Sequence, residues 1–241
     1  MSAVRHDFDE ILRLVRPGAR VLDIGCGFGS LATHLAEHHR VTVTGVTLSE
    51  QQLEAGRRRV RERGLERRVE LRLEDYRDVR GEYDAVVSVG MFEHVGAPQY
   101  GEFFGCVRRL LRAQGTALVH TIGVTSTPAP VNPWIRKYVF PGGHLPSASQ
   151  LTHAIEGSGL VLADLEVWRR HYALTLNEWN RRFQHAWPQL SGRFDDRFRR
   201  LWTFYLTASE AAFRVGKLAV FQAQLVKDVS RLPTTRDYLY K

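Results

Sequence analysis

The sequence predicts an α/β protein built on a doubly wound, mostly parallel sheet with a helical, aromatic-rich cap. Short apolar segments alternate with helical patterns through the first half of the chain, as in strands joined by crossover helices. The first apolar segment runs into closely spaced glycines, which is typical of a strand that turns into a helix. Polar side chains follow most predicted strands, at the edge where such sheets bind ligands. The 241 residues fit a single domain, 1–241.

Each element has its own pattern. An apolar stripe predicts a short helix over residues 9–15, which Pro17 and Gly18 end. Ser49 is a good helix cap, and Gln52 three residues later predicts a capping box. The expected strands cover 20–24, 41–46, 69–73, 83–89 and 116–121, with helices after the glycines, over 50–63 and over 99–111.

Two later segments are expected to form the cap. Residues 124–148 contain five prolines among aromatic side chains, which predicts an irregular insertion over the site. Helix and strand signals return over 150–167, and residues 175–226 are expected to be helical and rich in aromatics.

Composition excludes several classes of protein. No apolar run approaches the roughly 18 residues of a membrane span, and the N-terminus has no signal-peptide pattern. The two cysteines form no metal-ligand pattern, so we expect no metal and a reduced, cytoplasmic setting. The net charge of +8 and several paired arginines indicate an anionic partner, a phospholipid surface or nucleic acid, unless they are solvated helix faces. Without a nucleic-acid module signature, nucleic acid is not expected.

The stretch V-L-D-I-G-C-G-F-G, residues 21–29, is the strongest local motif. Gly25, Gly27 and Gly29 alternate with other residues, and Asp23 precedes the first of them by two positions. This G-x-G-x-G spacing departs from the dinucleotide pattern G-x-G-x-x-G. It resembles motif I of S-adenosylmethionine (SAM) methyltransferases, which implies a loop for the amino-acid moiety and sulfonium of SAM. The alternative is a tight strand-to-helix turn without a ligand.

Three further segments carry a more specific resemblance: G-M-F-E-H at 90–94, H-T-I-G at 120–123 and F-P-G-G at 140–143. With them in their order, the chain resembles the cyclopropane-fatty-acyl-phospholipid synthases, a group that includes the mycolic acid cyclopropane synthases and methyltransferases. The likeness runs from about residue 16 to 226. It implies a Rossmann-like, SAM-dependent methyltransferase domain.

The resemblance assigns residues to the cofactor. SAM would lie along the three glycines beside Asp23. Thr47 and Gln52 are implied to contact the cofactor, and Asp75 and Tyr76 fall where its adenine would lie. The alternatives are a helix-capping role for Gln52 and a plain strand end for Thr47.

The resemblance also implies a reaction: SAM-dependent transfer of a methylene to the cis double bond of a phospholipid acyl chain, with a bound bicarbonate ion as base. Its ligands would be Glu93, His120, Tyr205 and the backbone of Ile122. Such a mixture of donors and proton acceptors suits acid–base work. Aromatic faces stabilise a passing cation; the candidates are Tyr138, Phe140, Tyr172 and Phe213. All of these side chains have structural alternatives, as hydrogen-bond partners or core.

One departure from the family leaves other functions open. Its members carry a segment with a Tyr-Ser-Cys motif that closes over SAM, whereas only twenty residues precede Val21 here and none is Cys. We therefore expect a lid from another chain, in a homodimer or with a partner, or a different acceptor. The alternative functions are SAM-dependent N-, O- or C-methylation of a small molecule or fatty acyl chain, and non-catalytic SAM binding. In the main interpretation the protein is cytoplasmic and peripheral at the inner membrane surface.

Overall fold

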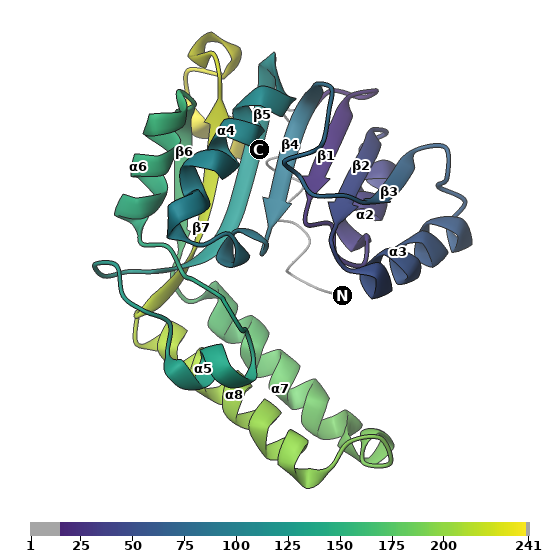
Figure 1. Cartoon of the computed structure of the whole chain (residues 1–241), viewed down its shortest axis with the longest axis vertical. Helices are drawn as coiled ribbons and strands as arrows, with labels where there is room; N and C mark the ends of the chain where they lie inside the picture. The colour runs from purple at the N-terminus through teal and green to yellow at the C-terminus, as the bar shows by residue number, and fades with distance from the viewer. Residues whose placement is uncertain (1–14, 240–241) are drawn as a thin grey trace.

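A seven-stranded sheet forms the centre of the protein, in the order β3-β2-β1-β4-β5-β7-β6 (Figure 1). The computed structural model describes residues 15–239. Strands β1 to β5 run parallel, and β7 runs antiparallel to both of its neighbours. The fold class predicted from the sequence is therefore confirmed. The strands are β1 Arg20–Ile24, β2 Thr42–Thr47, β3 Val69–Leu73, β4 Tyr83–Val89, β5 Leu111–Val124, β6 Val161–Trp168 and β7 Leu218–Val226.

Helices cover both faces of this sheet. Helices α2 and α3 follow β1 and β2, while α4 and α6 pack together over the strands from β4 onward. Helices α7 and α8 pair with each other and project beyond the sheet as an arm, with α5 beside them (Figure 1). The helices are α2 Ser30–His38, α3 Glu50–Glu62, α4 Tyr100–Leu110, α5 Pro133–Tyr138, α6 Ala148–Ser158, α7 His171–Leu190 and α8 Asp196–Arg214.

The alternation of side chains along β1 divides the core between the two faces. Leu22 and Ile24 join the cluster under α4 and α6, whereas Val21 joins the cluster under α2 and α3. All three are at most 1% exposed. Burying each such side chain contributes roughly 1.5–3 kcal/mol, so both helical layers are held through the same strand.

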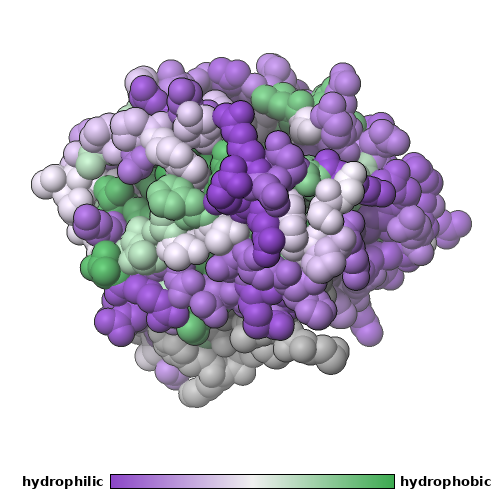
Figure 2. All heavy atoms as spheres, turned by 90° about the horizontal axis from the view of Figure 1, so that it is seen from below, coloured by the Kyte–Doolittle hydropathy of each residue, from purple (hydrophilic) through white to green (hydrophobic). Residues whose placement is uncertain are grey.

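The arm has a small core of its own, which ties it to the sheet. Leu176 of α7 and Leu206 and Phe213 of α8 pack with Val220 of β7. Figure 2 looks onto this end of the molecule and shows apolar side chains gathered beside a hydrophilic band. No helix within residues 15–239 is both long and apolar enough to cross a membrane.

The strand limits at 20–24, 69–73 and 83–89 agree with the sequence prediction, but the prediction of helix over the whole of 175–226 is wrong. Residues 218–226 form β7, a buried strand paired on both sides, between β5 and β6. The run L-A-V-F-Q-A-Q-L-V is apolar throughout, and such a run does not distinguish a buried strand from a buried helix. The short helix expected over 9–15 lies almost wholly outside the described residues.

Candidate active site

The glycine loop after β1 bends tightly against its neighbours. Gly25, Gly27 and Gly29 all have positive φ, at 79°, 53° and 69°. A Cβ on Gly25 would lie 2.5 Å from the side chain of Met91, whereas one on Gly27 would meet nothing within 4 Å. The first glycine therefore permits close packing, and the second leaves an open approach to the backbone.

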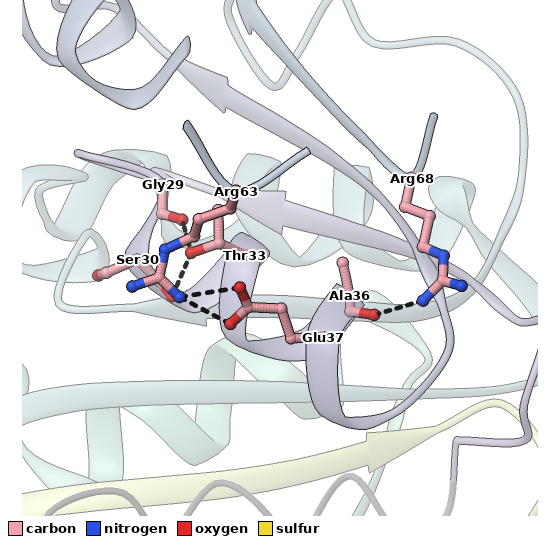
Figure 3. Close-up of polar contacts among 7 residues, drawn as sticks. All are labelled: Gly29, Ser30, Thr33, Ala36, Glu37, Arg63 and Arg68. Carbon is pink, nitrogen blue, oxygen red and sulfur yellow. Dashed lines mark hydrogen bonds and ion pairs between the residues drawn. The ribbon is translucent and has the colours of Figure 1, made fainter. Parts of the chain in front are cut away.

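Helix α2, which follows the loop, is anchored at both ends (Figure 3). The Thr33 hydroxyl donates to the carbonyl of Gly29 at 2.9 Å, inside the first turn. Arg63 reaches Glu37 with contacts of 2.7 and 2.9 Å, and Arg68 donates to the carbonyl of Ala36 at 3.1 Å. The first contact fixes the helix start, against which a ligand in the loop would lie, and the contacts of Arg63 and Arg68 fix the helix end.

Asp23 is a buried acid beside this loop. It is 2% exposed, and its Oδ2 has no hydrogen-bond partner among the described residues. Burial raises the pKa of Asp23 to about 7. A buried carboxyl without a partner fits a ligand that brings a cation or a hydrogen-bond donor to the loop.

Thr47 and Gln52 form a small network at the end of β2. The Thr47 hydroxyl donates to Gln52 Oε1 at 3.2 Å and accepts from the Ser49 N–H at 3.2 Å. Ser49 caps α3 as expected, accepting from the Gln52 N–H at 3.3 Å. The predicted capping box is wrong in its second half, because Thr47 takes the Ser49 N–H that Gln52 would have received.

The acid predicted to lie near adenine has a partner already. Asp75 accepts three hydrogen bonds from Arg77, at 2.7 to 3.0 Å, and the guanidinium holds the Asp75 pKa below its usual value. Tyr76 packs edge-on against Phe103. Apolar side chains are nevertheless exposed along this rim, at Phe28, Leu48 and Leu73.

Glu93 lies at the carboxyl end of β4, in the short 3-10 helix η1 (Phe92–His94). Its Oε1 accepts from the Ile122 N–H at 2.7 Å, and its Oε2 is buried with no partner in the part of the chain described. Burial raises the pKa of this carboxyl, and the Ile122 N–H opposes the rise. One oxygen is thus fixed to β5 and the other is left for a ligand or proton.

Other polar groups surround that carboxylate. Tyr100 Oη and His144 Nε2 are also buried and without a partner within residues 15–239. The His144 N–H donates to the Glu93 carbonyl at 2.7 Å. Burial first, and then the Glu93 charge, raise the pKa of Tyr100. Three buried polar atoms without partners, one of them on Glu93 itself, indicate a site built for a small polar ligand.

His120 reaches the same region from β5. It is the register partner of Gln222 on β7, and Gln222 Nε2 lies 2.9 Å from His120 Nδ1. An amide nitrogen only donates, so Nδ1 accepts and the ring proton sits on Nε2. Burial lowers the pKa of His120 to about 4, which keeps the imidazole neutral at neutral pH.

The model of the family described as mycolic acid cyclopropane synthetase matches residues 3–223. The chain belongs to the mycolic acid cyclopropane synthetase family. The cyclopropane-fatty-acyl-phospholipid synthase of Escherichia coli (strain K12) is 42% identical over 215 residues, which make up 89% of this chain and 55% of that protein. The tuberculostearic acid methyltransferase UfaA1 of Mycobacterium tuberculosis is 38% identical, over 94% of this chain and 55% of its own length. The chain thus spans about half the length of these relatives.

Solved structures of the family agree with the fold. The cyclopropane synthase MmaA2 from Mycobacterium tuberculosis superposes with a TM-score of 0.85 at 26% identity, covering 93% of this chain and 85% of that one. The mycolic acid cyclopropane synthase CmaA1 complexed with SAH and CTAB gives 0.84 at 28% identity, with the same coverage. These structures place the glycine loop of the present family member in a methyltransferase fold.

The structure brings Glu93 and Ile122 together. The Ile122 N–H donates to Glu93 Oε1 and so positions the carboxylate, and the contact of this backbone with a bicarbonate ion stays a prediction. Tyr205 lies in α8, where it packs with Ile122 and Tyr172 in the core of the arm. Phe140 contacts the Tyr205 ring at 5.8 Å between centroids.

The sequence assigned Tyr172 only as an aromatic face. Burial, and then the charges of Tyr205 and Glu93, raise the pKa of Tyr172, which places this hydroxyl near both side chains. Phe213 lies behind it at 5.3 Å between ring centroids and is 1% exposed, so it supports Tyr172 from the core. Tyr138 is 42% exposed and packs on Trp134 instead. Among the described residues, no cluster of three or more His, Cys, Asp or Glu could hold a metal ion.

Proposed function

We propose that this protein transfers a methylene group from SAM to the cis double bond of an unsaturated phospholipid acyl chain, forming a cyclopropane ring. The observation that carries the proposal is Glu93, held at one oxygen by Ile122 and left unpartnered at the other. It lies at the same sheet edge as the glycine loop, where β1 and β4 pair side by side. Family membership and the E. coli relative support the same reaction.

The cofactor residues fit SAM. Gly27 leaves an open approach, and the unpartnered Asp23 oxygen suits a ligand that carries positive charge. Thr47 and Gln52 offer a hydroxyl and an amide at the neighbouring strand end. SAM supplies an electrophilic methyl group, which the π electrons of the acyl alkene attack as S-adenosylhomocysteine leaves.

Residues of the chain then remove a proton from the new methyl group. A cation is left on the acyl chain, and the new methyl group must lose a proton so that its C–H electron pair closes the third ring bond. Glu93 is the carboxylate placed to receive that proton, directly or through a bound bicarbonate. The buried groups of Tyr100 and His144 offer hydrogen-bonding capacity for such an anion. Tyr172 and Phe140 present ring faces that stabilise the cation.

A second candidate shares the first step. The similarity to UfaA1 favours addition of the methyl group to an acyl chain without ring closure. In that case the proton leaves from the carbon next to the cation, and the product keeps an alkene. Methylation of a small molecule, or SAM binding without catalysis, would leave the acyl chain unchanged.

Incubation with SAM and dioleoyl phosphatidylglycerol, followed by proton NMR and mass spectrometry of the acyl chains, tests the proposal. The expected product gains one CH2 unit, loses its alkene signal and shows upfield ring protons. A product of the same mass that retains an alkene signal would establish the second candidate. Unchanged acyl chains, with S-adenosylhomocysteine formed only on small-molecule acceptors or not at all, would overturn both.

We also propose a cover over the cofactor, supplied by a second copy or another chain. The exposed apolar side chains of Phe28, Leu48 and Leu73 support this proposal because they lie at the glycine loop and at adjacent strand ends. Light scattering with and without S-adenosylhomocysteine tests it. A monomer at all concentrations, with tight cofactor binding, would contradict it.

A further inference from the structure

The arm carries a group of exposed aromatic rings, of which the proposed chemistry uses only Phe140. Tyr138 is 42%, Phe140 41% and Phe204 55% exposed. Trp134 joins them, with its ring 4.6 Å from that of Phe204 and 5.6 Å from that of Tyr138. Rings from α5 and α8 thus form one surface cluster, and clustered exposed apolar side chains mark interaction sites.

Cations lie on the same arm as these rings. Lys137 lies over the Tyr138 ring at 5.0 Å, and Arg136 beside it is exposed. Arg199 is fixed over the Trp187 ring at 5.3 Å and donates to Gln184 at 3.2 Å. Within residues 15–239 none of Arg136, Lys137, Arg199 and Arg200 forms an ion pair with a carboxylate. We call these four cations and the rings of Trp134, Tyr138, Phe140 and Phe204 the arm face.

The arm face includes a groove along α7 and α8. The groove has a volume of about 730 Å³, and Arg199, Arg200 and Phe204 line it together with the carboxylate of Asp196. Figure 2 shows this end of the molecule, with apolar residues next to a hydrophilic band. Aromatic rings beside unpaired cations match the boundary of a bilayer, where rings lie at head-group level and cations meet phosphates.

The arm face adjoins the candidate active site through Phe140. Its ring centroid lies 5.8 Å from that of Tyr205 and 6.2 Å from that of His94, the residue after Glu93. Phe140 and Glu93 are further connected because the Phe140 carbonyl accepts from Gly143 and the Glu93 carbonyl accepts from His144. A ligand that passes from the arm face into the protein at Phe140 therefore enters beside the residues proposed for catalysis.

We propose that the arm face seats the protein on an anionic phospholipid bilayer and admits the acyl chain past Phe140, an inference that rests on the proposed function for its substrate. A lipid surface is the partner that fits the arm face, because the face combines exposed rings with cations that form no ion pair, next to the candidate active site. Electrostatic attraction and ring insertion contribute separately, so they respond differently to salt.

Co-sedimentation of the whole chain with vesicles tests the proposal without relying on turnover. The vesicles contain phosphatidylcholine with or without 30% phosphatidylglycerol. Each cation near an anionic surface changes partitioning about fivefold, so Arg136→Gln/Arg200→Gln is expected to weaken binding to anionic vesicles about 25-fold and to flatten its salt dependence. The variant Tyr138→Ser/Phe204→Ser is expected to weaken binding while keeping the salt dependence.

A matched control removes the same charge elsewhere. Arg67 and Arg80 are exposed and precede β3 and β4, at the opposite edge of the sheet from Glu93. Arg67→Gln/Arg80→Gln is expected to bind within about twofold of the unmodified protein, because net charge alone is not the cause. Circular dichroism verifies that all variants are folded.

Glu93→Gln separates this proposal from the proposed function, because it should bind vesicles normally whatever its turnover. Equal losses in the arm-face and control variants, or no binding of the unmodified protein to anionic vesicles, would overturn the docking proposal. Unaltered vesicle binding by the arm-face variants, with loss of binding to an acidic acyl carrier protein, would overturn it in favour of a protein partner.

Discussion

Two halves of the sheet edge differ in how they are built. The cofactor half consists of the glycine loop and the ends of β1, β2 and β3, and consecutive strand–turn–helix units form it. The acceptor half consists of Glu93, β5, β7 and the arm, and segments far apart in the chain form it. Glu93 and Ile122 are separated by 29 positions, and His120 and Gln222 by 102. The cofactor half therefore depends on local backbone geometry, and the acceptor half on long-range pairing.

Of the substitutions that test this difference between the two halves, one in the glycine loop of the cofactor half is expected to have the largest effect. Gly25→Ala places a Cβ 2.5 Å from Met91 at a φ of 79°, so both a clash and backbone strain oppose the native loop. Together they cost about 3 kcal/mol, which corresponds to roughly a 100-fold loss of S-adenosylhomocysteine affinity if the loop moves to relieve them. Isothermal titration calorimetry measures this.

Gly64→Ala is the matched control for that variant. Gly64 has a φ of 64°, and a Cβ there would meet nothing within 4 Å. The Gly64→Ala variant should lose about 1 kcal/mol of folding stability and keep its cofactor affinity. Equal affinities for the two variants would show that the cofactor half does not depend on the close packing of its loop.

The next effect concerns the charge on Asp23. Its folded pKa of about 7 is above the value of 3.8 for an unburied Asp, so the folded state holds a proton that the unfolded chain releases. The contribution of Asp23 to folding stability is therefore greatest in acid and falls as the pH rises from 4 to 7. Between pH 5 and 8 the unmodified protein should lose roughly 2–3 kcal/mol relative to Asp23→Asn. Urea unfolding at both pH values measures this difference, and parallel curves for the two proteins would contradict it.

A smaller effect distinguishes the two tyrosines of the acceptor half. The charge of Glu93 contributes, after burial and Tyr205, to the raised pKa of Tyr172, whereas burial alone accounts for the raised pKa of Tyr205. Tyr172→Phe keeps the ring face but removes a hydroxyl near Glu93, so it is expected to lower turnover about tenfold with cofactor affinity unchanged, and Tyr205→Phe is expected to lower it less. S-adenosylhomocysteine release at saturating SAM measures both. A larger loss for Tyr205→Phe would contradict this ranking and support the assignment of Tyr205 made from the sequence.

The difference between local geometry in the cofactor half and long-range pairing in the acceptor half also explains which features the sequence predicted. The limits of β1, β3 and β4, and the loop that carries Gly25, follow from local apolar runs and punctuating glycines. The strand at 218–226 was missed because its identity depends on pairing with β5 and β6, which its own composition does not reveal.

Side-chain pairing was equally hidden from the sequence. The bonds of Thr47 to Gln52 and of Asp75 to Arg77 give these residues structural partners that the motifs did not show. The backbone N–H of Ile122 positions Glu93, and only the spatial arrangement of β4 and β5 shows this bond.

The turnover of Glu93→Gln tests the account most directly. Glutamine keeps an oxygen for the Ile122 N–H but receives no proton at neutral pH, so the fold and the cofactor half should stay intact. With unsaturated phospholipid and SAM, S-adenosylhomocysteine release is expected to fall tenfold or more, the lower range for loss of an acid–base group, while calorimetry shows unchanged S-adenosylhomocysteine binding. A release rate close to that of the unmodified protein would contradict the assignment of Glu93 to the chemistry, and with it the proposed acceptor site.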